Sequence, residues 1–102
     1  MTAHLDTKER TEALTMAGLA VAARDGWQRM TREAVAAEAG VSPALVTLRL
    51  GTVPAMRRAV MRRAVAMRVV PVVAAGLALG DKHAQKAGQG LRDEIAAWVA
   101  KQ

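Results

Sequence analysis

The fold is decided by residues 31–50, which read TREAVAAEAGVSPALVTLRL. Thr31 can cap a helix that ends at Gly40, where a tight turn favours a residue without a β-carbon. Ser42 can cap the next helix, and Pro43 then occupies its first turn, where a missing N–H is tolerated. Two helices joined this closely by a glycine-containing turn form a helix-turn-helix.

The apolar positions of this stretch predict how its two helices pack. Val35, Ala36 and Ala39 recur at helical spacing and form the inner face of the first helix. Ala36 is small enough to let the helices approach, while Val41 fills the angle between them and Val46 packs the second helix onto the first. The N-terminal end of the second helix can then enter a DNA major groove. An ordinary αα-hairpin has the same local pattern and is the alternative at this point.

Helical periodicity extends along the rest of the chain. Alanine, the strongest helix former, occurs 23 times, and no segment alternates with the period of a strand. We expect an all-α fold, a small bundle of about five to six helices. Further helices are expected over residues 6–24, 72–79 and 91–100, with a loop or weak helix over 82–90. Another helix is expected to run from Thr52 toward Val70, and Pro71 is expected to end or kink it.

Two aromatic residues mark expected packing points. Trp27 follows the glycine that ends the first helix and is expected to anchor this turn in the core. Trp98 lies in the last helix. That helix is expected to place on one apolar face Leu91, Ile95, Trp98 and Val99.

Positive charge is concentrated in the middle of the chain. The formal net charge is +6, and residues 27–70 hold eight arginines against only Glu33 and Glu38. These arginines are Arg29, Arg32, Arg49, Arg57, Arg58, Arg62, Arg63 and Arg68. Arg58 and Arg62 are four residues apart and share a helix face. Because guanidinium groups suit phosphate oxygens and guanine edges, the segment is either a polyanion-binding surface or a solvated helix face.

The composition excludes several classes of function. Without cysteine the chain has no disulfide, thiolate zinc site, iron–sulfur cluster or thiol nucleophile. Trp27 and Trp98 are too few aromatic residues for the base-stacking platform of single-strand-binding domains. His4 and His83 are isolated, and Ser42, the only serine, is explained as a helix cap. We therefore expect no catalytic residue, no metal site and no cofactor.

Residues 10–65 resemble the DNA-binding domain of TetR-family repressors. That family combines an apolar stripe on the first helix, a glycine, an aromatic residue, a capping threonine and an "IA…AGVS" core. The matching residues are Leu14, Ala17, Val21, Gly26, Trp27, Thr31, Val35, Ala36, Ala39, Gly40, Val41 and Ser42, with Met56 in the fourth helix. The resemblance implies a homodimeric transcriptional repressor that inserts helix 43–50 into the major groove of double-stranded DNA.

The chain departs from the family pattern at three positions and in length. Thr47 and Leu50 stand where the family has aromatic residues, and Val53 stands where it has a lysine. Phosphate contacts are therefore expected to fall on other residues, namely Arg29, Arg32, Arg49, Arg57 and Arg58. The family's ligand-binding domain is much longer than residues 66–102, so we expect no small-molecule effector.

These considerations predict a DNA-binding site. Thr31 and Arg32 begin the second helix and are expected to meet phosphate. Arg49 is expected to bind guanine or phosphate, with plain surface charge as its alternative. The groove-facing edge of the recognition helix is expected to comprise Ser42, Pro43, Ala44, Thr47 and Leu48. Its methyl groups can meet thymine methyls and its hydroxyls can hydrogen-bond to base edges.

The expected organisation is a DNA-binding domain, residues 1–65, and a short helical tail, residues 66–102. Residues 69–79 read VVPVVAAGLAL and are too apolar all round for an exposed helix. We expect them to form both the core beneath the last helix and a homodimer interface, since two-fold dimers are usual for such readers. The run is shorter than the ~20 residues that cross a bilayer. No signal-peptide core opens the chain, so a cytoplasmic location away from membranes is expected.

Three functions compete on these observations. The first is a sequence-specific DNA-binding transcriptional regulator. The second is a protein-interaction adaptor that uses the helix-turn-helix as a scaffold and the apolar 69–79 surface to bind another protein. The third is non-specific coating of nucleic acid by the arginine-rich helix. We do not expect an enzyme.

Overall fold

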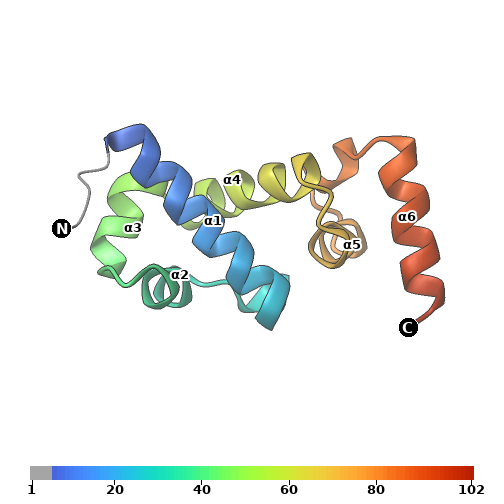
Figure 1. The fold of residues 1–102 in the computed structure, drawn as a ribbon, viewed down its shortest axis with the longest axis horizontal. Helices are drawn as coiled ribbons and strands as arrows, with labels where there is room; N and C mark the ends of the chain where they lie inside the picture. Colours follow the sequence, from blue (N-terminus) through green and yellow to red (C-terminus); the bar gives the residue numbers. More distant parts are fainter. Residues whose placement is uncertain (1–5) are drawn as a thin grey trace.

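The computed structural model describes residues 6–102, so His4 lies outside the described residues. Within that range all regular structure is helical, as expected, and the molecule measures 45 × 24 × 21 Å (Figure 1). The α-helices are α1 (Thr7–Asp25), α2 (Arg32–Ala39), α3 (Pro43–Leu50), α4 (Val53–Ala66), α5 (Val70–Ala78) and α6 (Gln89–Ala100). Single 3-10 turns, η1 and η2, lie at Trp27–Arg29 and Ala84–Lys86.

The first four helices each begin with a side-chain cap. The Asp6 carboxylate accepts the backbone N–H of Glu9 at 2.7 Å. The hydroxyls of Thr31, Ser42 and Thr52 accept the N–H three residues further on, at 3.1, 3.2 and 3.2 Å. Such caps satisfy donors that have no partner within the helix. The predicted starts of these helices are therefore confirmed.

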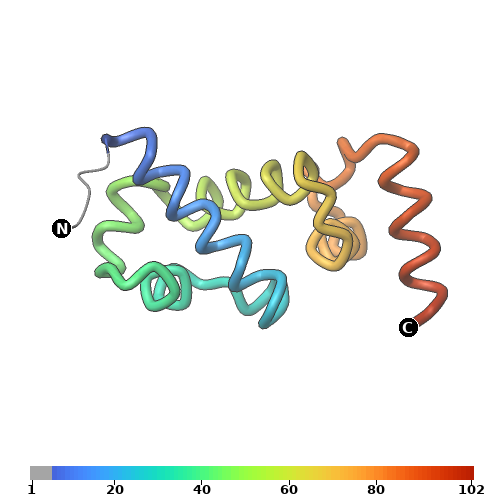
Figure 2. The backbone as a smooth tube through the Cα atoms, viewed as in Figure 1, coloured from blue at the N-terminus to red at the C-terminus, as the bar shows by residue number. Residues whose placement is uncertain are grey.

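The helix-turn-helix packs under α1. Gly40 ends α2 with a φ of 69°, the left-handed conformation expected of this turn. Val35, Ala36 and Val46 are buried, as predicted, and Trp27 is buried beside them in the core. Helix α1 crosses α4 closely at Gly18, where a β-carbon would lie 2.7 Å from a Val60 methyl group. Helix α1 thus packs against α2, α3 and α4, and α3 also contacts α4 (Figures 1 and 2).

The expected path of the fourth helix is wrong at its C-terminal end. Helix α4 ends at Ala66 rather than running toward Val70. Arg68 adopts a φ of 57°, and the N–H of Val69 bonds the carbonyl of Ala64 at 2.9 Å. This left-handed residue and its hydrogen bond close the helix in the manner of a Schellman motif. Pro71 does not end α4; it lies in the first turn of α5, where proline is tolerated.

Helices α5 and α6 extend the same core toward the end of the molecule opposite α3 (Figure 2). In α5, Val72, Val73 and Gly76 are buried, so the 69–79 run does form core. Helix α6 buries Leu91 and Ile95. The prediction of one apolar face that also includes Trp98 and Val99 holds only in part, because Trp98 is half-buried and Val99 is 53% exposed.

The buried residues of both predicted parts belong to one cluster. The boundary near residue 65 is therefore a change of helix direction within a continuous core. Across residues 6–102, no helix combines the length and apolar character that a membrane crossing requires.

Candidate nucleic-acid interface

Helix α3 presents an open face that carries no acidic side chain. Pro43, Ala44, Thr47 and Leu48 are exposed, while Val46 and Leu50 on the opposite side are buried. Leu48 is 69% exposed, the highest value among the large apolar residues that are exposed. These spacings follow the helical period, so one face of α3 holds it to the core and the other is free. The predicted groove-facing residues therefore lie on one accessible surface.

Arg32 links the start of α2 to the middle of α3. Its guanidinium donates a hydrogen bond to the Thr47 hydroxyl oxygen at 2.7 Å, and that hydroxyl donates to the Pro43 carbonyl at 3.3 Å. Thr31, the cap of α2, is exposed beside it. No spacing rule predicts this hydrogen bond, since Arg32 and Thr47 are 15 residues apart in the sequence. It joins two predicted contact residues into a single surface.

Arg57 has a structural role that its position in an arginine pair did not reveal. Its guanidinium carbon lies 4.2 Å from the centroid of the Trp27 ring, a cation–π arrangement. The same group donates to the carbonyls of Met30 and Trp27, each at 3.2 Å. Arg57 therefore fastens the turn after α1 to α4, and its donors are turned toward the protein.

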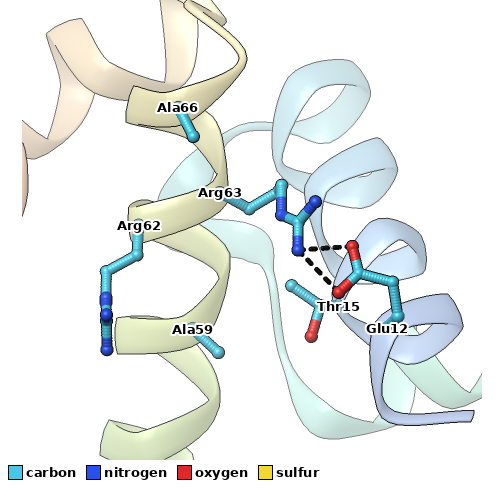
Figure 3. Close-up of a pocket in the computed structure, with 6 residues that line it drawn as sticks. All are labelled: Glu12, Thr15, Ala59, Arg62, Arg63 and Ala66. Carbon is cyan, nitrogen blue, oxygen red and sulfur yellow. Dashed lines mark hydrogen bonds and ion pairs between the residues drawn. The ribbon is translucent and has the colours of Figure 1, made fainter. Parts of the chain in front are cut away.

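The two members of the second arginine pair, Arg62 and Arg63, also differ in their contacts. Arg63 reaches across to α1 and forms an ion pair with Glu12, whereas Arg62 extends away from that pair (Figure 3). Arg58 and Arg62 are exposed and have no hydrogen bond or ion pair within residues 6–102. The i, i+4 spacing predicted that these two share a face. In each pair, one arginine supports the fold and the other faces solvent.

The eight central arginines thus form two groups of four. Arg32, Arg57, Arg63 and Arg68 have hydrogen-bond or ion-pair partners, Arg68 through Glu94. Arg29, Arg49, Arg58 and Arg62 form no hydrogen bond or ion pair within the described range, although the charge of Arg29 contributes to the lowered pKa of Asp25. Arg49 is half-buried, and its Nε is a buried donor without a hydrogen-bond acceptor. Charge available for a ligand is therefore smaller than the sequence count indicates.

An exposed ion-pair network joins the end of α1 to α2. Arg24 donates to both oxygens of Asp25 at 3.0 Å and to Glu38 at 2.7 Å. The hydrogen bonds from Arg24 hold the pKa of the Asp25 carboxyl below its usual value. Glu33 and Glu38 are exposed on α2. Glu33 Oε2 lies 3.9 Å from the Nε of Arg32. The acidic groups of this region are thus on α2 and the end of α1, and α3 itself carries none.

Within residues 6–102, no group of three or more histidine, aspartate and glutamate side chains could hold a metal ion. Comparisons of the chain with protein-family models, curated proteins and solved structures find no match. The resemblance of residues 10–65 to TetR-family domains therefore stays a prediction. The candidate interface depends on its own geometry, which is an open face on α3 flanked by cationic groups.

Proposed function

We propose that this protein is a sequence-specific regulator of transcription that binds double-stranded DNA, acting as a small homodimeric repressor in the cytoplasm. The observation that carries the proposal is the face of α3. A short helix, capped at Ser42 and packed through Val46 and Leu50, leaves a row of small and apolar side chains exposed and free of acidic groups. A helix presented in this way fits the major groove.

The exposed side chains of α3 suit direct contact with base edges. Ala44, Leu48 and the Thr47 methyl group would meet thymine methyl groups. The Ser42 and Thr47 hydroxyls would exchange their present hydrogen bonds for bonds to bases or bridging water. Arg49 would bind guanine or phosphate through the terminal nitrogens of its guanidinium group. Pro43 contributes its exposed ring at the groove edge.

Phosphate contacts would flank this helix. Arg29 and Arg58 are exposed and form no hydrogen bond or ion pair within residues 6–102. Thr31 and Arg32 lie at the N-terminus of α2, where backbone N–H groups favour anions. Arg57 would act indirectly by fixing the turn that carries Arg29. These contacts position the protein on the duplex, while α3 supplies the sequence preference.

Two-fold association would double the length of DNA that is read. Exposed large apolar side chains of the C-terminal part are Met67, Leu79 and Val99, and we assign the subunit contact to this part. An adaptor that uses the 69–79 surface has less support, because Val72, Val73 and Gly76 are already buried within the chain.

Selection from a random duplex library tests the proposal most directly. An enriched palindromic sequence is expected, with two half-sites related by two-fold symmetry. Retention of duplexes without enrichment, together with a steep salt dependence, would instead identify non-specific coating of nucleic acid. Failure to retain any duplex at low salt would leave the adaptor function as the better account.

Two variants separate sequence reading from phosphate binding. Arg49→Ala is expected to relax the preferred sequence, whereas Arg32→Ala should weaken binding to all duplexes alike. Lys101→Ala, which removes an exposed charge after α6, provides the charge-matched control. If Arg49→Ala leaves the selected sequence and its affinity unchanged, Arg49 has no role in recognition.

A further inference from the structure

A cationic groove runs beside α4, on residues outside the recognition helix. One wall is α4, and the other is the connection between α5 and α6, residues 81–86. Two open cavities of about 340 and 400 Å³ make up the groove, and His83 lines both. The first is lined by Val53, Pro54, Arg57, Arg58, Asp81, Lys82 and His83. The second is lined by Arg62, Val65, Ala66, His83 and Lys86.

Five cationic side chains line this groove, and one of them, Arg57, is already hydrogen-bonded to backbone carbonyls. The other four come from two separate elements. Arg58 and Arg62 come from α4, and Lys82 and Lys86 come from the connection. All four are exposed, and none has a hydrogen bond or ion pair to another described residue. Like charges gathered on facing walls repel one another, so the arrangement favours an anion between them.

The single acidic residue of the groove is already engaged. Asp81 Oδ1 accepts the backbone N–H groups of His83 and Ala84, each at 2.9 Å. Asp81 thus shapes the turn that brings Lys82 to α4 and offsets only part of the surrounding charge. His83 lines both cavities, and its Nδ1 atom is buried without a hydrogen-bond partner among the described residues.

The pairing of other arginines makes this groove unusual within the molecule. Arg63 and Arg68 also reach toward other helices, and each meets a glutamate there, Glu12 and Glu94. Among the residues that line the groove, the single carboxylate is that of Asp81, and its Oδ1 accepts backbone N–H groups instead of pairing with an arginine. The groove therefore has the charge of a binding surface rather than that of an internal helix contact.

We propose that this groove binds phosphate groups of the DNA backbone beside the bases that α3 reads. The inference rests on the proposed function and adds the α5–α6 connection to the DNA interface. Val53 and Pro54 line the first cavity and open α4, which starts three residues after α3 ends, and both cavities are open to solvent. An open cationic track suits a polymer backbone, since small ligands are held in enclosed and largely apolar pockets.

The test compares salt dependence of duplex binding among charge variants of the full chain. Lys82→Ala and Lys86→Ala each remove one groove charge, and Lys101→Ala removes an exposed charge outside the groove. Each groove variant should flatten the plot of log affinity against log salt by about 0.9, and the double variant by about 1.8. Their selected sequence should be unchanged, and Lys101→Ala should match the unmodified protein.

Three other outcomes overturn the assignment in distinguishable ways. If the unmodified protein selects a duplex but the groove variants keep its salt slope, the groove inference fails and the proposed function stands. If no duplex binds at low salt, the proposed function fails and the DNA assignment of the groove fails with it. Titration with inorganic pyrophosphate tests whether the groove binds a free phosphate compound instead of the DNA backbone. Saturable binding that is lost in the double variant, with an unchanged DNA slope, would assign the groove to a free phosphate compound and overturn the DNA assignment.

Discussion

Helices α1–α4 and helices α5–α6 are held in place by different means. Each of the first four helices begins with a side-chain cap, from Asp6, Thr31, Ser42 and Thr52. The residues at the N-cap positions of α5 and α6 are Val69 and Gly88, and neither provides a side-chain cap. Local hydrogen bonds therefore define the starts of α1–α4, whereas the C-terminal helices depend on contacts with distant residues.

Helix α5 contacts α1, η1, α4, η2 and α6. Gly76 of α5 lies against Met61 and Ala84, and Arg68 at the end of α4 pairs with Glu94 of α6. Arg68 is an exposed ion-pair partner in a left-handed conformation, so this pair adds little stability. We therefore expect the stability of α1–α4 and that of α5–α6 to respond differently to changes in packing and in capping.

The largest effect is expected from Gly76→Ala. A β-carbon there would lie 2.8 Å from the Ala84 β-carbon and 2.4 Å from Met61 Cε, and the Ala84 atom can move only with its backbone. The overpacking should lower the free energy of unfolding by about 2 kcal/mol in urea titrations. Hydrogen exchange should show that α5 and α6 lose protection before α1–α4.

Gly88→Ala is the matched control for Gly76→Ala. An added β-carbon at Gly88 meets nothing within 4 Å, and the backbone there has an ordinary extended conformation. Its stability should remain within about 0.5 kcal/mol of the unmodified protein. Equal losses in the two variants would contradict the close packing of α5 against α4 and η2.

The next effect is expected from Arg57→Met, which keeps an apolar stem but removes the guanidinium. Loss of the Trp27 contact and of two hydrogen bonds to carbonyls should lower the free energy of unfolding by about 1.5 kcal/mol. Trp27 fluorescence should change as well. Arg58→Met should leave stability and fluorescence unaltered while weakening duplex binding. The reverse result would exchange the roles of the two arginines.

Thr52→Ala tests the importance of capping in the first part. The hydroxyl accepts the Ala55 N–H at 3.2 Å, and its removal should cost about 1 kcal/mol. Thermal unfolding followed by circular dichroism would measure the loss. Thr52→Ser retains the acceptor and should retain most of the stability. If both variants behave alike, the cap does not hold the start of α4.

The smallest effect is expected from adding the cap that α6 lacks. Gly88 has φ −70° and ψ 168°, a conformation that suits a capping serine, and the site has open space. Gly88→Ser should raise the free energy of unfolding by a few tenths of a kcal/mol. A larger gain would show that the start of α6 limits the stability of the C-terminal part. Destabilisation would indicate that the loop needs the freedom of glycine.

Much of the fold could be predicted because its signals are local. The caps at Thr31, Ser42 and Thr52 act over three residues, and the turn at Gly40 requires one residue with positive φ. The prediction that Pro71 ends or kinks the fourth helix was wrong, because a proline can either end a helix or lie in the first turn of the next one. The choice between them depended on Arg68 taking the left-handed conformation, which no local residue type signalled.

The candidate site could be predicted in its helices and only in part in its charges. The exposed face of α3 follows directly from helical period, since burial of Val46 and Leu50 leaves Ala44, Thr47 and Leu48 outside. The number and position of the arginines were also plain in the sequence. No sequence pattern indicates a role for segment 81–86, because only the fold places Lys82 and Lys86 opposite α4.

The sequence by itself thus determined which residues form helices and where the first four begin, because caps, glycine turns and apolar spacing act within a few residues. Only the tertiary structure decided which cations are free. Arg57 meets Trp27 and Arg63 meets Glu12 across separations of 30 and 51 residues, and no spacing rule anticipates such pairs. A charge count treats every arginine alike, whereas folding distributes them between the core contacts and the surface.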